Sequence, residues 1–227
     1  MLAAMPRPEA AVFDVIETIF PLETLRPRLA ALDLGGELDL FFTRILRDAF
    51  ALDATGTFKP FREIATGALE VLAAQRGLDH PDRAAIEAVM DGFASLDPAP
   101  DVRPAMERLR AAGVTVATLS NGGVEATRGL LARAGLLPLV SRVMGVDEIR
   151  RYKPGKAIYL HAATALGVAP ARLAMIAVHA WDLEGARRAG LVTGWASRHE
   201  RRWHPAMQPP DVSGANLVEV VERLLAR

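Results

Sequence analysis

The sequence predicts an α/β fold, in which a parallel β-sheet carries an all-helical block inserted after its first strand. Residues 11–15 read as a short buried strand, residues 20–97 show only helical periodicity, and from residue 103 onward strand and helix patterns alternate. Repeated strand–helix units indicate a parallel sheet with right-handed crossovers. The first strand must then join this sheet across the helical block. We therefore expect residues 1–19 and 98–227 to form the α/β core domain, with residues 20–97 as a helical cap domain.

The helical block contains three segments with a clear helical pattern, at residues 38–52, 60–75 and 81–94. In the first segment, apolar residues recur about every 3.6 positions and define one face. Arg44 lies at the edge of this face and is expected to look into a crevice, whereas Arg47 points the opposite way. The alternative for Arg44 is an arginine that lays its stem along a packed helix edge.

The second half of the chain follows a proline-rich linker at residues 97–101. Four of its predicted helices end at a glycine, the residue that most readily adopts the left-handed conformation beyond a helix end. The predicted strands are residues 114–119, 140–145, 173–178 and 191–195, and the predicted helices are residues 103–111, 124–134, 156–166, 183–189 and 217–225.

The composition limits the possible partners. The chain has 227 residues, 51% of them hydrophobic, which is enough for a sizeable core. Lys and Arg together equal Asp and Glu at 27 each, so no net field favours nucleic acid, and no apolar run is long enough to span a bilayer. There is no cysteine, which excludes disulfides and thiolate chemistry, and residues 1–10 lack the apolar core of a secretion signal. We therefore expect a cytoplasmic protein without nucleic-acid or membrane partners.

A carboxylate stands at the end of the first predicted strand. Asp14 follows apolar residues up to Phe13, and the hydroxyl of Thr18 comes four residues after Asp14. A charge at the end of a buried strand is costly unless it is paired or used, and the carboxyl ends of parallel strands are where such sheets bind ligands. Asp14 is therefore a candidate nucleophile. The alternative is an aspartate that caps a helix or forms a turn.

Polar residues also follow the next two predicted strands. Ser120 and Asn121 precede two glycines and a helix start, and such a turn presents backbone N–H groups to an anion. Lys153 stands before a proline at another helix start, where the helix dipole disfavours a cation, and Tyr159 follows on that helix. Many strand–helix turns resemble the first pattern, and a surface lysine is the alternative explanation for the second.

The strand predicted at residues 173–178 leads directly to His179 and, three residues later, to Asp182. A hydrogen-bonded core histidine and a helix N-cap are the alternative explanations for these two residues. Along the chain, the four strand ends thus carry a carboxylate, a hydroxyl with an amide, a lysine, and a second carboxylate.

This order of polar residues resembles the four motifs of the haloacid dehalogenase superfamily, and the helical block is similar to that superfamily's cap. The resemblance covers nearly the whole chain. Within the superfamily the chain most resembles the L-2-haloacid dehalogenases (type II), and the similar tracts are residues 42–50, 180–182 and 194–198. The resemblance implies a Rossmann-like parallel-sheet core, a helical cap, and hydrolysis of a carbon–halogen bond without a metal or another cofactor.

The resemblance also implies a reaction in two steps. Asp14 would attack the α-carbon of a short (S)-2-haloacid, expel halide and form an aspartyl ester, which water would then hydrolyse to the 2-hydroxyacid. Lys153 would hold Asp14 ionised, and Asp182 would orient Lys153 or the water. The other implied site residues bind the substrate carboxylate (Thr18, Ser120 and Asn121), hold the halide (Arg44) or lie beside the network (Tyr159).

A magnesium-dependent phosphatase of the same superfamily is the main alternative. Such enzymes use a second aspartate two residues after the nucleophile as a proton donor, and this chain has Ile16 there. Magnesium prefers several oxygen ligands, whereas only Asp182 follows Ala177 and Val178 in the fourth motif. A halide leaves without a proton donor or a metal, so these differences favour the dehalogenase.

Two departures from the family pattern lie near Asp14. Ile16 and Glu17 replace the usual Tyr-Gly, and an inward Glu17 would repel an anionic substrate, so we expect it to face outward or to pair with an arginine. Ala177 and His179 replace the usual Ser and Asn, so His179 would either activate water or donate to the halide. These changes leave open a third hypothesis, a family member that binds a small acid without turnover.

The expected partners are therefore a haloacid and a halide ion, with a homodimer as an open question. Phe41, Phe42 and Phe50 would supply an apolar dimer surface if they were exposed. A packed cap core accounts for these three side chains equally well.

Overall fold

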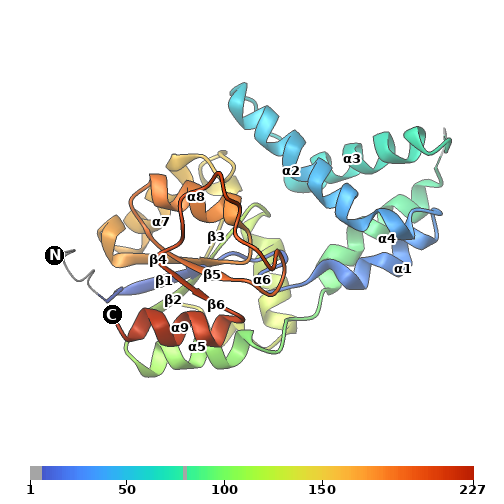
Figure 1. The fold of residues 1–227 in the computed structure, drawn as a ribbon. Helices are drawn as coiled ribbons and strands as arrows, with labels where there is room; N and C mark the ends of the chain where they lie inside the picture. Colours follow the sequence, from blue (N-terminus) through green and yellow to red (C-terminus); the bar gives the residue numbers. More distant parts are fainter. Residues whose placement is uncertain (1–6, 79–80) are drawn as a thin grey trace.

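The structure, a computed structural model, describes residues 7–78 and 81–227, so residues 1–6 of the expected core domain lie outside the described residues. The described chain contains a six-stranded parallel sheet in the order β3-β2-β1-β4-β5-β6 (Figure 1). The strands are β1 Ala10–Phe13, β2 Thr115–Ser120, β3 Arg142–Gly145, β4 Leu173–Ala177, β5 Val192–Ala196 and β6 Val212–Gly214. The first strand of the chain thus lies between β2 and β4 in the middle of the sheet, and Asp14 follows it directly.

Helices cover both faces of the sheet. Alternate side chains of β1 enter two different apolar clusters, as the two-residue period of a strand requires. On one face, Ala11 and Phe13 pack with α5 (Val102–Ala111), α6 (Val124–Arg133) and α9 (Leu217–Leu225). On the other face, Ala10 and Val12 pack with α7 (Lys156–Leu166) and α8 (Ala180–Arg188). This is the α/β architecture that the alternating pattern predicted.

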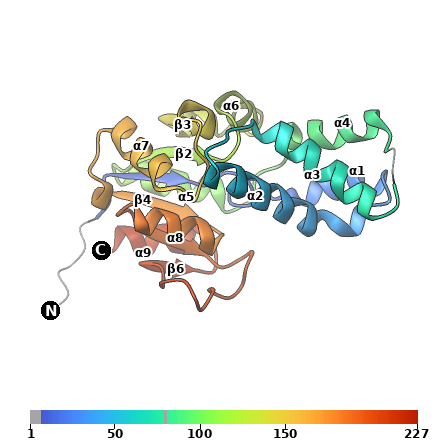
Figure 2. The same cartoon turned by 90° about the horizontal axis from the view of Figure 1, so that it is seen from above.

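Four helices of the segment between β1 and β2 lie together beyond the sheet, as both views show (Figures 1 and 2). They are α1 (Arg26–Ala30), α2 (Leu38–Ala54), α3 (Phe61–Gln75) and α4 (Arg83–Gly92). The sequence predicted the last three, and α1 is too short for a periodic pattern. Within the described residues, no helix combines the length and the apolar character needed to cross a bilayer.

The three phenylalanines of α2 do not form an exposed apolar surface. Phe41 is fully buried, and its ring packs edge-on to Phe93. Phe42 and Phe50 are half-buried and lie against the rings of His179 and Trp181, respectively. These side chains therefore face the interior of the molecule.

The start of α8 differs from the prediction. We expected the helix to begin at residue 183, but it begins at Ala180, so that Asp182 lies in its first turn and His179 occupies the N-cap position. Gly185 lets this helix lie close to the segment that contains Lys153, because a Cβ there would be 2.6 Å from the Cβ of Pro154. The early start and the close approach bring Asp182 to Lys153.

Candidate active site

One buried ammonium group joins two carboxylates at the carboxyl end of the sheet. Lys153 Nζ donates hydrogen bonds to Asp14 Oδ1 at 3.0 Å and to Asp182 Oδ2 at 2.9 Å. The three residues come from the end of β1, the loop before α7, and the first turn of α8. Lys153 and Asp182 are completely buried, and Asp14 is 6% exposed. The fold thus brings together three side chains that the sequence had placed in separate motifs.

The charges of this cluster are unequally stabilised. Burial alone would raise the pKa of Asp14, but the Lys153 ammonium and nearby hydrogen-bond donors outweigh it and hold that pKa well below its usual range. Burial opposes the charge of Lys153, yet the two carboxylates raise its pKa. Burial raises the pKa of Asp182. Asp14 is therefore the carboxylate that is most firmly ionised, as a nucleophile must be.

Both oxygens of Asp182 are engaged within the cluster. Tyr159 donates its hydroxyl proton to Asp182 Oδ1 at 2.6 Å, while Oδ2 accepts from Lys153. The phenol is fully buried, and this burial raises its pKa well above the ordinary value. Asp182 and Tyr159 thus hold the lysine in place.

Thr18 fixes the other oxygen of Asp14. Its hydroxyl donates to Asp14 Oδ2 at 2.7 Å and accepts from the backbone N–H of Val178 at 3.1 Å. Since Val178 occupies one lone pair of the hydroxyl, the hydroxyl proton is directed at Asp14. The carbonyl of Val178 in turn accepts from the Trp195 indole N–H at 3.0 Å, which fixes this end of β4.

An amide donor without a partner lies beside this cluster. Asn121 Oδ1 accepts from the backbone N–H of Lys153 at 3.0 Å, whereas Asn121 Nδ2 is buried and has no hydrogen-bond partner. Ser120 Oγ accepts from the N–H of Gly122 at 2.8 Å, just before α6 begins. Ser120 and Gly122 line a cavity of about 250 Å³, together with Ile16 and apolar cap residues that include Phe61, Ala65, Met90 and Phe93. The first N–H of α6, that of Val124, already donates to Asp147 at 3.2 Å, so Asn121 Nδ2 is the donor that is left for an anion.

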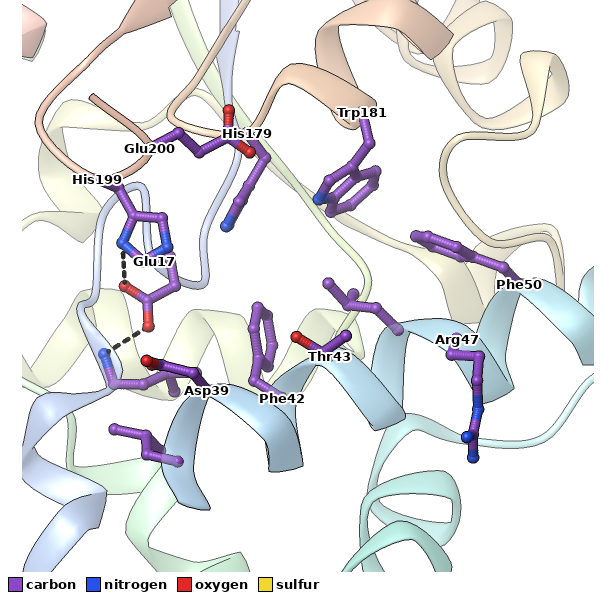
Figure 3. Close-up of a pocket in the computed structure, with 13 residues that line it drawn as sticks. Glu17, Asp39, Phe42, Thr43, Arg47, Phe50, His179, Trp181, His199 and Glu200 are labelled. Atoms are coloured by element: carbon purple, nitrogen blue, oxygen red, sulfur yellow. Dashed lines mark hydrogen bonds and ion pairs between the residues drawn. The ribbon is translucent and has the colours of Figure 1, made fainter. Parts of the chain in front are cut away.

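A second cavity, of about 650 Å³, lies between α2 and the start of α8 (Figure 3). His179 is 5% exposed and projects into it toward Phe42. His179 Nδ1 lies 3.9 Å from Asp14 Oδ2, beyond hydrogen-bond length, and has no hydrogen-bond partner. Burial lowers the pKa of His179, but the Asp14 carboxylate raises it by more, so that it lies above its ordinary value.

Aromatic rings hold the His179 ring in place. Trp181 stacks on it with centroids 5.6 Å apart, and Phe42 lies on the α2 side at 6.2 Å. Phe50 packs against Trp181 at 5.1 Å. The cavity wall therefore combines residues of α2 with residues that follow β4.

The structure does not place Arg44 at this cavity, contrary to our expectation. Its Nη2 donates to Gln75 Oε1 at 2.5 Å, so the side chain faces α3. Arg47, expected to point away, is the arginine that lines the cavity, and its guanidinium pairs with Asp48 at 2.7 Å. Among the described residues, Arg44 Nε and Nη1 are buried without a hydrogen-bond partner, and the halide-binding role expected for Arg44 stays a prediction.

The expectation for Glu17 is also wrong. Its carboxylate lines the cavity, accepts from the N–H of Leu22 at 3.2 Å, and lies 3.5 Å from His199 Nδ1 (Figure 3). His199 and Glu200 also line the cavity and were not identified from the sequence. The only available signal was their position three and four residues after the end of β5 (Val192–Ala196).

A metal ion does not fit this site well. The two carboxylates of the cluster already share the Lys153 ammonium. Elsewhere in residues 7–78 and 81–227, no three His, Asp or Glu side chains are arranged to hold a metal. The donor set therefore does not match the several oxygen ligands that magnesium prefers.

The fold and the site define a class: an α/β protein with helices inserted after β1 and with a lysine-bridged aspartate pair at the carboxyl end of its sheet. A family model for haloacid dehalogenase-like hydrolases matches residues 9–190. The chain belongs to this family.

Individual relatives agree with this assignment. An (S)-2-haloacid dehalogenase of Pseudomonas sp. (strain CBS-3) is 30% identical over 95% of this chain and 96% of its own length. Another, of Pseudomonas sp. (strain YL), is 27% identical over 92% of this chain and 91% of its own. The crystal structure of an L-2-haloacid dehalogenase superposes with a TM-score of 0.90 at 26% identity, covering 96% of this chain and 99% of the other.

Proposed function

We propose that this protein is a hydrolytic dehalogenase that converts a short (S)-2-haloacid to a 2-hydroxyacid and halide. The observation that carries the proposal is the state of Asp14, an ionised carboxylate oriented by Lys153 and Thr18. Membership of the haloacid dehalogenase-like hydrolases and the similarity to (S)-2-haloacid dehalogenases support it. Ile16 supports it further, because phosphoryl transfer would need a proton donor at that position.

In the first step, Asp14 attacks the α-carbon and forms an ester while the carbon–halogen bond breaks. The substrate carboxylate is bound by Asn121 Nδ2, which has no other partner in the described part of the chain, and by the Ser120 hydroxyl. Lys153 and Thr18 keep Asp14 ionised and aligned. No metal takes part in this step, and the halide leaves as a stable anion without a proton.

In the second step, water attacks the Asp14 carboxyl carbon, and His179 is the base. Both oxygens of Asp182 are already bound to Lys153 and Tyr159, whereas His179 Nδ1 is free and close to Asp14. An in-line displacement puts the halide on the far side of the α-carbon from Asp14. A group 3.9 Å from Asp14 Oδ2 is therefore better placed to activate water than to hold the halide.

We also propose that residues 20–97 act as a cap and that residues 1–19 and 98–227 form the catalytic core. Phe42 and Phe50 of α2 pack on His179 and Trp181, so the cap supplies one wall of the cavity. Exclusion of bulk water by such a wall would protect the ester from uncontrolled hydrolysis and strengthen the electrostatic interactions around Asp14.

The test is halide release from (S)-2-chloropropionate, chloroacetate and fluoroacetate in the presence of EDTA. p-Nitrophenyl phosphate with magnesium is run in parallel. Halide release that survives EDTA is the expected result. Phosphate release only with magnesium would replace the proposal with a phosphatase, and inactivity in both assays would favour a member that binds a small acid without turnover.

A further inference from the structure

Two histidines and a glutamate form a polar path from Asp14 to the solvent. The His179 and His199 rings meet edge to face with their centroids 5.2 Å apart. His199 Nδ1 lies 3.5 Å from Glu17 Oε2. All three residues line the cavity between α2 and the start of α8, and Figure 3 shows them facing its interior. The path begins near Asp14 Oδ2, whereas Lys153 binds Oδ1, and of its three residues only His179 has a part in the steps described above.

The buried end of the path cannot release a proton unaided. The His179 side chain is 7% exposed, and it faces Asp14, Asp182 and Glu200, whose charges stabilise its protonated form. Hydrolysis of a haloacid nevertheless yields one free proton for each halide. The proton that His179 collects must therefore be handed to another group.

His199 is suited to receive it. Its side chain is 41% exposed, and burial together with the charges of His179 and Arg198 lowers its pKa, while Asp39 opposes this change. At neutral pH the ring is thus mostly neutral and can accept a proton, then lose it to water. The two rings are in direct edge-to-face contact, so a small rotation of either ring would bring a nitrogen of one toward the other.

The backbone holds Glu17 in this inward position. Glu17 adopts a left-handed conformation, with φ at 66°. Arg198 donates hydrogen bonds to the carbonyls of Glu17 and Thr18, and Leu22 donates its N–H to the Glu17 carboxylate. A non-glycine residue in this region is uncommon and is maintained only when its surroundings enforce it.

We propose that His199, positioned by Glu17, is the exit for the proton released in each turnover. Water adds to the Asp14 carboxyl carbon while the bond to the 2-hydroxyacid oxygen breaks, and one water proton passes through His179 to that leaving oxygen. The second water proton remains on the regenerated Asp14 carboxyl. It moves to His179, then to His199, and then to solvent, which returns Asp14 to its ionised form. This inference rests on the proposed dehalogenase function.

The test separates proton release from the chemistry in a single turnover of (S)-2-chloropropionate in weak buffer. Ester on Asp14 is followed by quenched-flow mass spectrometry, and released protons by a pH indicator. We expect His199→Gln to form the ester at the wild-type rate and to release its proton about tenfold more slowly. Added imidazole should restore the rate, and Glu17→Gln should show a smaller delay.

A matched control is available in His161→Gln. His161 forms a pair with Glu148 at the same 3.5 Å separation but on α7, outside the cavity, so its proton release should equal that of the wild type. Wild-type proton release in His199→Gln, or a delay that imidazole does not restore, would overturn the inference. A wild-type enzyme that forms no ester and releases no halide would instead overturn the proposed function.

Discussion

Asp53, in the last turn of α2, binds Arg151 of the core through two hydrogen bonds. Arg151 Nε and Nη2 donate to the two carboxylate oxygens at 2.8 and 3.0 Å, and the N–H of Tyr152 donates to Oδ1 at 2.9 Å. The Tyr152 hydroxyl donates to the carbonyl of Lys59, which lies between α2 and α3. Lys153 follows immediately, so one carboxylate ties the end of α2 to the segment that carries the cluster lysine.

We expect Asp53→Ala to impair catalysis although the residue does not contact the reacting atoms. Loss of this link loosens both the end of α2 and the segment that contains Lys153. Small displacements of catalytic groups lower the reaction rate strongly. The expected result is a fall of about tenfold in kcat/KM for the haloacid with little change in the far-UV circular dichroism spectrum. Glu63→Gln is the control. Glu63 lies on α3 and forms an exposed ion pair with Lys59, so the loss of this pair should leave kcat/KM unchanged. Equal kcat/KM in both variants would mean that the link does not position the site.

Asp14→Asn should remove activity while the protein remains folded. The amide is nearly the same size, and its one oxygen can still accept from Lys153, but it lacks the negative charge that attacks carbon. We expect kcat to fall at least about a thousandfold. The measurement is halide release together with mass spectrometry for a trapped ester. A variant that forms ester on another residue would show that the nucleophile is misassigned.

Lys153→Met should destabilise the protein in a pH-dependent way. The change leaves two buried carboxylates without their cation, which costs about 3–5 kcal/mol near neutral pH. In the wild type the pKa of Asp14 is lower in the folded protein than in the unfolded chain. The ionised carboxylate therefore stabilises the fold at pH values above the unfolded-state pKa, and this contribution is lost as the pH falls. In the variant, burial without a cation raises the pKa of the Asp14 and Asp182 carboxyls above their unfolded-state values, so stability is lost as the pH rises.

Urea unfolding at pH 4.5 and pH 7.5 measures this reversal. The deficit of Lys153→Met relative to the wild type should be larger at pH 7.5. Lys156→Met, an exposed lysine on α7, is the control and should match the wild type at both values. The same deficit at both pH values would mean that the loss comes from packing rather than from the unpaired carboxylates.

Much of the fold follows from local patterns in the sequence. Buried strands, helical periodicity and terminal glycines depend on neighbouring residues, which explains why the sheet and most helices were predicted. The three-residue strand β6 carries no such pattern. The start of α8 was misplaced because aspartate is a favoured N-cap, and Asp182 could as well have preceded the helix as entered its first turn.

The orientation of individual side chains required the tertiary structure. Arg44 and Arg47 are three positions apart on α2, which places them only about 60° apart around the helix axis. Periodicity alone therefore could not decide which of them faces the cavity. The inward turn of Glu17 depends on a left-handed backbone and on Arg198, more than a hundred residues away. Such contacts leave no local signal in the chain.

The charge of Asp14 should control the role of His179 during turnover. In the free enzyme the ionised Asp14 raises the pKa of His179 above its ordinary value of 6.5. Once Asp14 is esterified, its negative charge is gone, and burial then lowers the pKa of His179. The histidine thus becomes neutral, and therefore basic, at the stage when water must be activated.

Two measurements test this change in the pKa of His179. The NMR titration of His179 in the free enzyme should give a pKa above 6.5, whereas the rise of kcat with pH should have its midpoint below that value whenever ester hydrolysis limits the rate. His179→Ala should form the ester and then accumulate it, with the mass increase located on the peptide that contains Asp14. Slow ester formation with no accumulation would instead assign His179 to the departing halide, because the first step rather than the second would then depend on its ring.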